Sequence, residues 1–249
     1  MTSRRILSLL AVALSLAQTS SAADPTPPSA ATQPAKPLVH EISPGVLEVG
    51  LARLDQKART VTFPAKLNMA SGALEYLLVT PAGSAHESLL VSSAQPNDVH
   101  LAMLLLGAKG AGILAPAASD APPPQLNSEY LKTAPKLKGD AISISVKWTK
   151  NGKPASAAVE SWIRNSTTGK AAKAGPWIYT GSMFSGEYFL AQSEGAFAAI
   201  VTNPSALINN PREGSDNDTI WEVNESAVPP VDTPVEFVIH LDTPPDSSK

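Results

Sequence analysis

Proline-rich segments divide this chain, because proline lacks a backbone N–H and is excluded from helix interiors and central strands. Five of the 23 prolines fall within residues 24–37, and three more stand together within residues 115–125. The chain end, residues 243–249, has a similar composition. We expect a solvated tether at 24–37, an insert at 115–125 and a disordered tail.

The folded part is expected at residues 38–242, as a single domain. The block before the insert is small and carries a very apolar helical segment, which needs cover from the rest of the chain. The sequence leaves open whether the insert at 115–125 separates two domains.

Residues 1–23 have the pattern of a secretory signal peptide. Arg4 and Arg5 precede the apolar stretch 6–17, and the small residues Ser21 and Ala23 come before Asp24. The stretch is shorter than the roughly 20 apolar residues that span a bilayer. We predict an exported protein, periplasmic or extracellular, with no integral membrane segment after cleavage. The arginine pair leaves both the general secretory and the twin-arginine route open.

The composition excludes several kinds of chemistry and partner. With no cysteine, the chain has no disulfide, no lipidated Cys anchor and no thiolate ligand for zinc or an iron–sulfur cluster. Its 43% hydrophobic and 16% charged residues predict a packed core. No basic cluster is interleaved with aromatic residues, so nucleic acid is not an expected partner. An envelope protein or a small-molecule ligand is the remaining expectation.

Alternation of apolar and polar residues predicts a mainly β fold. The predicted strands are 46–51, 60–63, 73–80, 87–92, 142–148, 157–163, 177–184, 188–191, 196–201, 220–223 and 235–241. Asn151-Gly152 is a strong signal for a tight turn between two of them. The spacing predicts one helix, 96–106, which is apolar around nearly its whole circumference and therefore buried. We expect sandwich-like antiparallel sheets with this one clear helix.

Several segments resemble one family of exported bacterial proteins. They are LEYLLVTPAGSAHESLLVSSAQPNDVHLAMLLLG from Leu74, VESWI from Val159, TGSMF from Thr180 and NPREGSDNDTIWEVNESAVPPVDTPVEFVIHL from Asn210. They are similar to the YdjY-domain family, over roughly residues 47–241. The resemblance implies an exported protein and no settled activity. Some relatives are associated with iron–sulfur segments, a role that this cysteine-free chain does not share.

His86, Glu87, Asp98 and His100 form the first candidate site. The pattern places His86 and Glu87 at the start of a strand, and Asp98 and His100 in the first turns of the helix that follows. Two imidazoles and a carboxylate suit Zn²⁺ or another borderline divalent ion. The alternative is structural, with Asp98 at the helix start and His100 bonded to nearby backbone. The two neighbours His86 and Glu87 cannot both face one site if they lie in a strand.

Two further groups are weaker candidates. Glu160 and Trp162 share a strand face and, with His86, are candidate ligand-binding residues, since a Glu beside a Trp lines many small-molecule grooves. The alternative is a solvent-facing Glu160 and a packed Trp162. Oxygen ligands gather at Asp216, Asn217, Asp218 and Glu222 as in a calcium loop, but without the EF-hand spacing, so a turn is favoured.

The common catalytic signatures are absent from the sequence. It has no Gly-x-Ser-x-Gly elbow, Walker loop, His-Glu-x-x-His or dinucleotide-binding glycine pattern. We therefore expect a non-enzymatic binding or envelope-associated module. The alternative is a metal-dependent enzyme or metal-binding protein that uses His86, His100 and a nearby carboxylate.

Overall fold

The structure is a computed structural model, which describes residues 39–110 and 137–242. The predicted signal peptide, tether, insert and tail lie outside these residues. The described chain is mainly β, which confirms the predicted fold class. None of its helices is long and apolar enough to span a membrane.

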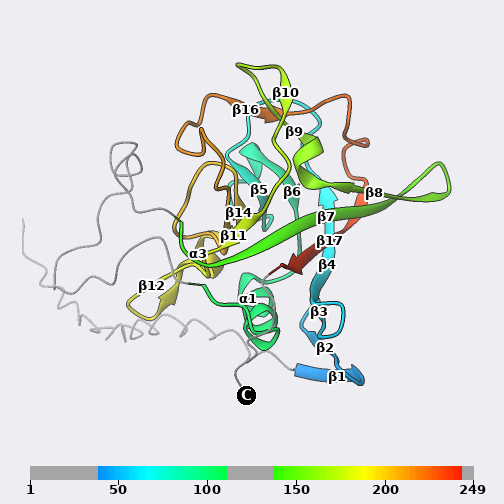
Figure 1. The fold of residues 1–249 in the computed structure, drawn as a ribbon, viewed down its shortest axis with the longest axis vertical. Coiled ribbons are helices and arrows are strands. Elements are labelled where there is room, and N and C mark those ends of the chain that lie inside the picture. Colours follow the sequence, from blue (N-terminus) through cyan, green and yellow to red (C-terminus); the bar gives the residue numbers. More distant parts are fainter. Residues whose placement is uncertain (1–38, 111–136, 243–249) are drawn as a thin grey trace, which may run out of the picture. The chain divides into compact units, whose positions relative to one another are not determined.

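The elements follow one another along the chain as Figure 1 shows. Before the gap lie β1 (Val39–Ser43), β2 (Val46–Val49), β3 (Ala52–Asp55), β4 (Thr60–Leu67), β5 (Tyr76–Val79), the 3₁₀ turn η1 (Ala85–Glu87), β6 (Ser88–Val91) and α1 (Pro96–Leu105). After it come β7 (Asp140–Lys150), β8 (Lys153–Ala158), the 3₁₀ turn η2 (Val159–Trp162), β9 (Ile163–Asn165), β10 (Lys170–Ala171), β11 (Trp177–Tyr179), β12 (Phe184–Ser185), β13 (Tyr188–Phe189), α3 (Leu190–Glu194), β14 (Ala196–Ala199), β15 (Ile208–Asn209), β16 (Trp221–Val223) and β17 (Pro234–Leu241).

The main sheet closes on itself. Its strands follow the order β4, β17, β7, β11, β15, β14, β5 and β6, and β6 then pairs with β4. One edge of β4 is shared, because Arg53–Asp55 of β3 pair with its first residues and β6 pairs with Lys66 and Leu67. Closure leaves few open strand edges. Two pairs, β5–β6 and β14–β15, are parallel, so the sheet is mixed where an antiparallel one was expected.

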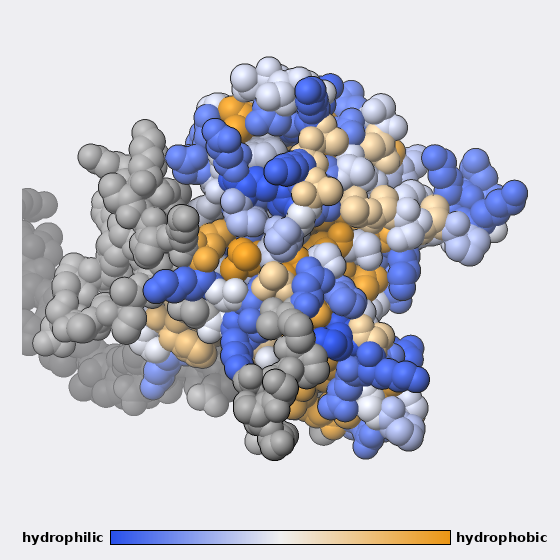
Figure 2. Space-filling view, in the orientation of Figure 1, coloured by the Kyte–Doolittle hydropathy of each residue, from blue (hydrophilic) through white to orange (hydrophobic). Residues whose placement is uncertain are grey.

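The β7–β8 hairpin confirms the predicted tight turn. Lys150 pairs with Lys153 across the turn, and Asn151 and Gly152 have φ of +52° and +74°. Positive φ at both central residues is what a type I′ turn requires, and the twist of such a turn matches the twist of the flanking strands. The tip of this hairpin projects from the sheet and is hydrophilic (Figure 2).

The core contains residues from both sides of the gap. Phe63 of β4 packs on Phe237 of β17 at 5.3 Å between ring centroids, and on Phe197 of β14 at 5.5 Å. β4 and β14 are not neighbours in the sheet, so the second contact crosses the space that the sheet encloses. All three rings are at most 2% exposed.

The helix α1 is only half-buried, which corrects the predicted all-round burial. Val99, Ala102 and Met103 face the core, but Leu104 and Leu105 are 48% and 41% exposed. An apolar circumference shows that a helix can be buried on every side, but neighbouring elements decide how much of it is covered. In the described chain α1 contacts β2, β3 and β4 along one side.

The other differences lie at strand ends. The segment 157–163, predicted as one strand, is divided by η2, and 188–191 ends in the helix α3. The strands β1, β3, β10 and β15 were not predicted. These elements have two to five residues, and propensity over so short a segment is easily overridden by tertiary contacts.

Candidate functional site

An acidic cavity of about 300 Å³ lies where β5, α3 and two loops meet. Glu75 and Tyr76 stand at the start of β5, and Glu194 is the last residue of α3. The loops at 201–205 and 216–218 complete the wall. Segments from three distant parts of the sequence therefore build one concave site, as is usual for small-molecule pockets.

A turn fixes the loop at 201–205. The Asn203 amide N–H donates to Asn209 Oδ1 at 2.8 Å, and the Ser205 N–H donates to Asn203 Oδ1 at 2.8 Å. Asn203 Nδ2 then donates to the Tyr76 hydroxyl at 2.7 Å. Because this hydroxyl accepts from Asn203, its own proton stays available for an acceptor. Burial raises the pKa of Tyr76, so the phenol keeps that proton at neutral pH.

Four carboxylates line the cavity: Glu75, Glu194, Asp216 and Asp218. Glu194 accepts a hydrogen bond from the Ser205 hydroxyl at 2.8 Å. Within the described residues, none of the four is within 4.0 Å of a Lys or Arg nitrogen. Burial, followed by the nearby charges of Glu87 and Asp218, raises the pKa of Glu75. The cavity therefore collects negative charge that no Lys or Arg of the described residues neutralises.

His86 lies beside this charge, on η1 and not in a strand. Its side chain is 80% exposed, and its Nε2 is 3.6 Å from Glu87 Oε1. A 3₁₀ turn allows these neighbours to meet, whereas a strand would point them to opposite faces. His86 also acts on Glu75, whose pKa it lowers against the stronger effects of burial and Glu87.

The structure does not bring the four predicted metal ligands together. His86 is next to Glu87, whereas Asp98 lies against Gly50 and His100 bonds to Tyr179. In residues 39–110 and 137–242, no three His, Cys, Asp or Glu side chains are grouped as a metal site requires. The four residues belong to three neighbourhoods, because η1 holds His86 and Glu87 close enough to act on Glu75, and α1 carries Asp98 and His100 elsewhere.

His100 has a structural contact of its own. Its Nδ1 is 2.7 Å from the Tyr179 hydroxyl, and its ring packs at a tilt against Phe189, with 4.8 Å between ring centroids. Burial raises the pKa of Tyr179 and lowers the pKa of His100. The tyrosine therefore stays protonated and the imidazole neutral, so the contact is a hydrogen bond between two uncharged groups.

This contact predicts a loss of stability in mild acid. The pKa of His100 lies below its ordinary value of 6.5 in the folded chain, so the unfolded chain binds the proton more readily. The stabilisation is complete above pH 6.5 and is lost as the pH falls through the folded pKa, by at most about 1.4 kcal/mol per pH unit. His100→Gln keeps an acceptor without a titrating ring. Urea unfolding from pH 7.5 to 5 should give a flatter curve for His100→Gln, and two parallel curves would contradict the prediction.

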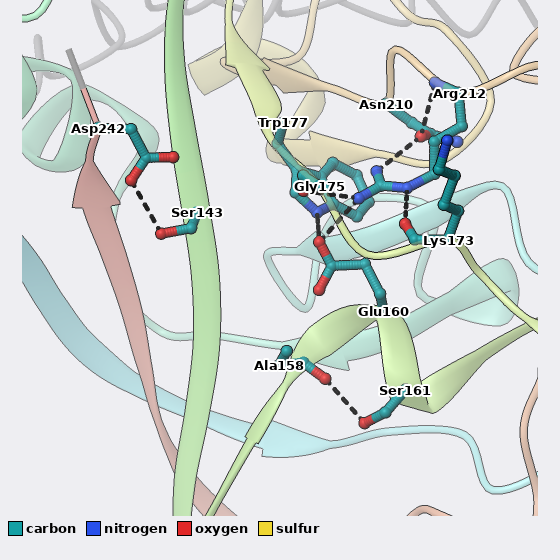
Figure 3. A network of polar contacts seen from close by, with 10 residues as sticks. All are labelled: Ser143, Ala158, Glu160, Ser161, Lys173, Gly175, Trp177, Asn210, Arg212 and Asp242. Carbon is teal, nitrogen blue, oxygen red and sulfur yellow. Dashed lines mark hydrogen bonds and ion pairs between the residues drawn. The ribbon is translucent and has the colours of Figure 1, made fainter.

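Glu160 and Trp162 are buried in the interior, which corrects both the groove and the solvent-facing interpretation. Glu160 Oε1 is 2.7 Å from Arg212 Nη2 and accepts from Trp177 Nε1 at 3.1 Å (Figure 3). Trp162 is 1% exposed and packs edge-on against Trp148. The alternation argument failed here because η2 replaces the predicted strand. The buried Trp148 Nε1 has no hydrogen-bond acceptor among the described residues.

The structure also separates the candidate calcium ligands Asp216, Asn217, Asp218 and Glu222. Glu222 is bound to Arg164, and Asn217 Oδ1 accepts from the Thr219 N–H at 2.9 Å, as a turn-forming Asn does. Only Asp216 and Asp218 face the acidic cavity. The favoured prediction of a turn fits the contacts of Asn217.

Comparison with known proteins gives one match, to a family. No curated protein and no solved structure matches the chain. The YdjY domain model matches residues 53–240, which include the closed sheet, α1 and every wall of the acidic cavity. This range agrees with the segments that suggested the resemblance. The chain therefore belongs to the YdjY domain family.

Proposed function

We propose that this chain is an exported binding module that takes a small cationic group in the acidic cavity. The observation that carries the proposal is the set of four carboxylates around one cavity, without a Lys or Arg partner among the described residues. An ammonium or guanidinium group would supply the missing charge. The Tyr76 hydroxyl would supply a hydrogen-bond donor for a polar atom of the same ligand.

Export is the second part of the proposal. It rests on the basic, apolar and small-residue regions of residues 1–23, which the described structure does not include. Expression with cell fractionation should place a chain that begins at Asp24 outside the cytoplasm. A measured mass of the purified chain that still includes residues 1–23 would contradict cleavage of the signal peptide.

Binding is tested with putrescine as an amine and calcium chloride as a metal, at constant ionic strength, by calorimetry. We expect putrescine to bind, and Asp216→Asn with Asp218→Asn to weaken it about tenfold, which corresponds to ~1.4 kcal/mol. Glu187→Gln with Glu225→Gln is the matched control, because it removes the same charge at exposed residues outside the cavity. Calcium binding without putrescine binding would favour the metal-binding alternative. No binding of either would remove the cavity from consideration.

Glu75→Gln separates a ligand site from a structural one. The charged form of Glu75 is disfavoured in the folded chain, because its pKa is raised by burial and by Glu87. This destabilisation is present at pH 7 and disappears as the pH falls through the folded pKa. We expect Glu75→Gln to raise the free energy of unfolding at pH 7 and to weaken putrescine binding. A loss of stability would show that Glu75 has a structural role instead.

A further inference from the structure

A second cavity, of about 570 Å³, is lined in part by residues 211–213 and Trp221, which stand before and after Asp216 and Asp218 in the sequence. It is formed by the β9–β10 hairpin, the segment that follows β10, and residues 211–213. Its walls include Ala171, Pro176, Pro211 and Trp221, so an organic body has apolar surface to contact. The space is larger than a lone inorganic ion requires.

The charge of this second cavity is opposite to that of the first. Lys170, Lys173 and Arg212 line it, and Glu213 is its one carboxylate. Within the described residues, neither lysine nitrogen is within 4.0 Å of a carboxylate. The chain as a whole carries a formal charge of −3, so this local excess of cations is against the general trend. Such a concentration attracts anions to the cavity.

Arg212 adds a buried donor to the wall. Its side chain is 10% exposed, and its N–H groups donate to Lys173 O, Asn210 Oδ1, Glu160 Oε1 and Gly175 O. A guanidinium has five N–H groups, so one Nη1–H has no acceptor among the described residues. Burial lowers the pKa of Arg212 even though Glu160 opposes this effect. An additional anion would therefore be favourable beside it.

We propose that this second cavity binds a small organic anion, through a carboxylate or phosphate group held by Lys170, Lys173 and the remaining N–H of Arg212. The site shares no lining residue with the proposed cation site. The two classes of anion share the oxyanion chemistry that lysine and arginine recognise.

The test is calorimetry with glucose 6-phosphate and glucuronate, with glucose as the neutral reference and chloride held constant. ¹H–¹⁵N spectra locate any binding, through shifts of the Lys170 and Lys173 amides and of Arg212 Nε–H. We expect one or both anions to bind and glucose not to bind. Binding of one anion alone supports the proposal and identifies the group. Absence of binding by both, or equal binding of glucose, overturns it.

Charge reversal provides the matched control. Lys170→Glu with Lys173→Glu should weaken anion binding about fivefold or more. Lys57→Glu with Lys153→Glu makes the same change in net charge at exposed lysines outside the cavity, and should change the affinity less than about twofold. An equal loss of anion affinity in both double variants would show that the net charge of the chain attracts the anion. That result would overturn the proposal of a specific site.

Discussion

Replacing Arg212 by alanine should lower the free energy of unfolding by about 3–5 kcal/mol. The side chains of Arg212 and Glu160 are 10% and 6% exposed, so the substitution leaves a carboxylate buried without its counter-charge. It also removes a guanidinium that stacks over Trp177 at 5.1 Å. Urea unfolding followed by tryptophan fluorescence measures the loss.

The chain offers a matched control for this prediction in a second Arg–Glu pair. Arg164 and Glu222 are in contact at 2.8 Å, but their side chains are 38% and 29% exposed. Water screens such a pair, so Arg164→Ala should cost less than about 1 kcal/mol. Equal losses in Arg164→Ala and Arg212→Ala would show that burial does not decide the effect.

A double-mutant cycle separates the charge from the packing. Glu160→Gln leaves the guanidinium uncompensated, and Arg212→Met leaves the carboxylate uncompensated. The double variant leaves neither charge, so it should lose less stability than the sum of the two single variants, by at least about 1 kcal/mol. An additive result would assign the stability to shape alone.

The Arg212 network also bears on the acidic cavity. Arg212 O accepts from the Ser215 N–H, and Ser215 O accepts from the Thr202 N–H at 2.7 Å. These bonds connect Arg212, whose side chain is buried, to the loop that carries Asp216 and to the turn at 201–205. Arg212→Ala keeps these backbone groups but removes the side-chain bonds that hold residue 212 in place, so it should weaken putrescine binding as well, although Arg212 lines only the other cavity.

The sequence indicated part of this site and missed the rest for a physical reason. Asp216 and Asp218 were included in the candidate calcium loop because they are close together in the chain. Glu75, Glu194 and Tyr76 did not, since they come from different segments and only the folded sheet places them around one cavity. Glu160 was selected for its neighbour Trp162, but its actual partner, Arg212, is 52 residues away. Pairings at such separations have no signal in local spacing.

The fold was easier to predict from the sequence than the site, because the alternation of apolar and polar residues along a strand follows the burial of its side chains. The long strands β4, β7 and β17 largely follow the period of two, and the predicted strands 60–63, 142–148 and 235–241 cover half of β4 and most of β7 and β17. Closure of the sheet was not predicted, since it depends on β6 reaching β4 across an interval that contains β5. The turn η2, which divides 157–163, buries Glu160 against Arg212, a long-range contact that propensity does not describe.

Phe63→Ala tests whether the enclosed space is filled as a single core. We expect a loss of about 3–5 kcal/mol, because the ring is 2% exposed and the change leaves a cavity among Phe197, Phe237 and their neighbours. Phe63→Leu keeps much of the volume and should lose less. Phe184→Ala removes the same ring where it is 63% exposed and should cost about 1 kcal/mol or less.

The pattern of losses distinguishes a closed sheet from two sheets that pack separately. Phe63 lies on β4 and Phe197 on β14, which the closed sheet separates by β17, β7, β11 and β15 in one direction and by β5 and β6 in the other. If the two rings stabilise one core, Phe63→Ala and Phe197→Ala should be coupled, and the double variant should lose less than the sum of the single losses. Unfolding must also remain one transition by fluorescence and circular dichroism. Two transitions, or strictly additive losses, would show that β4 and β14 belong to separate cores.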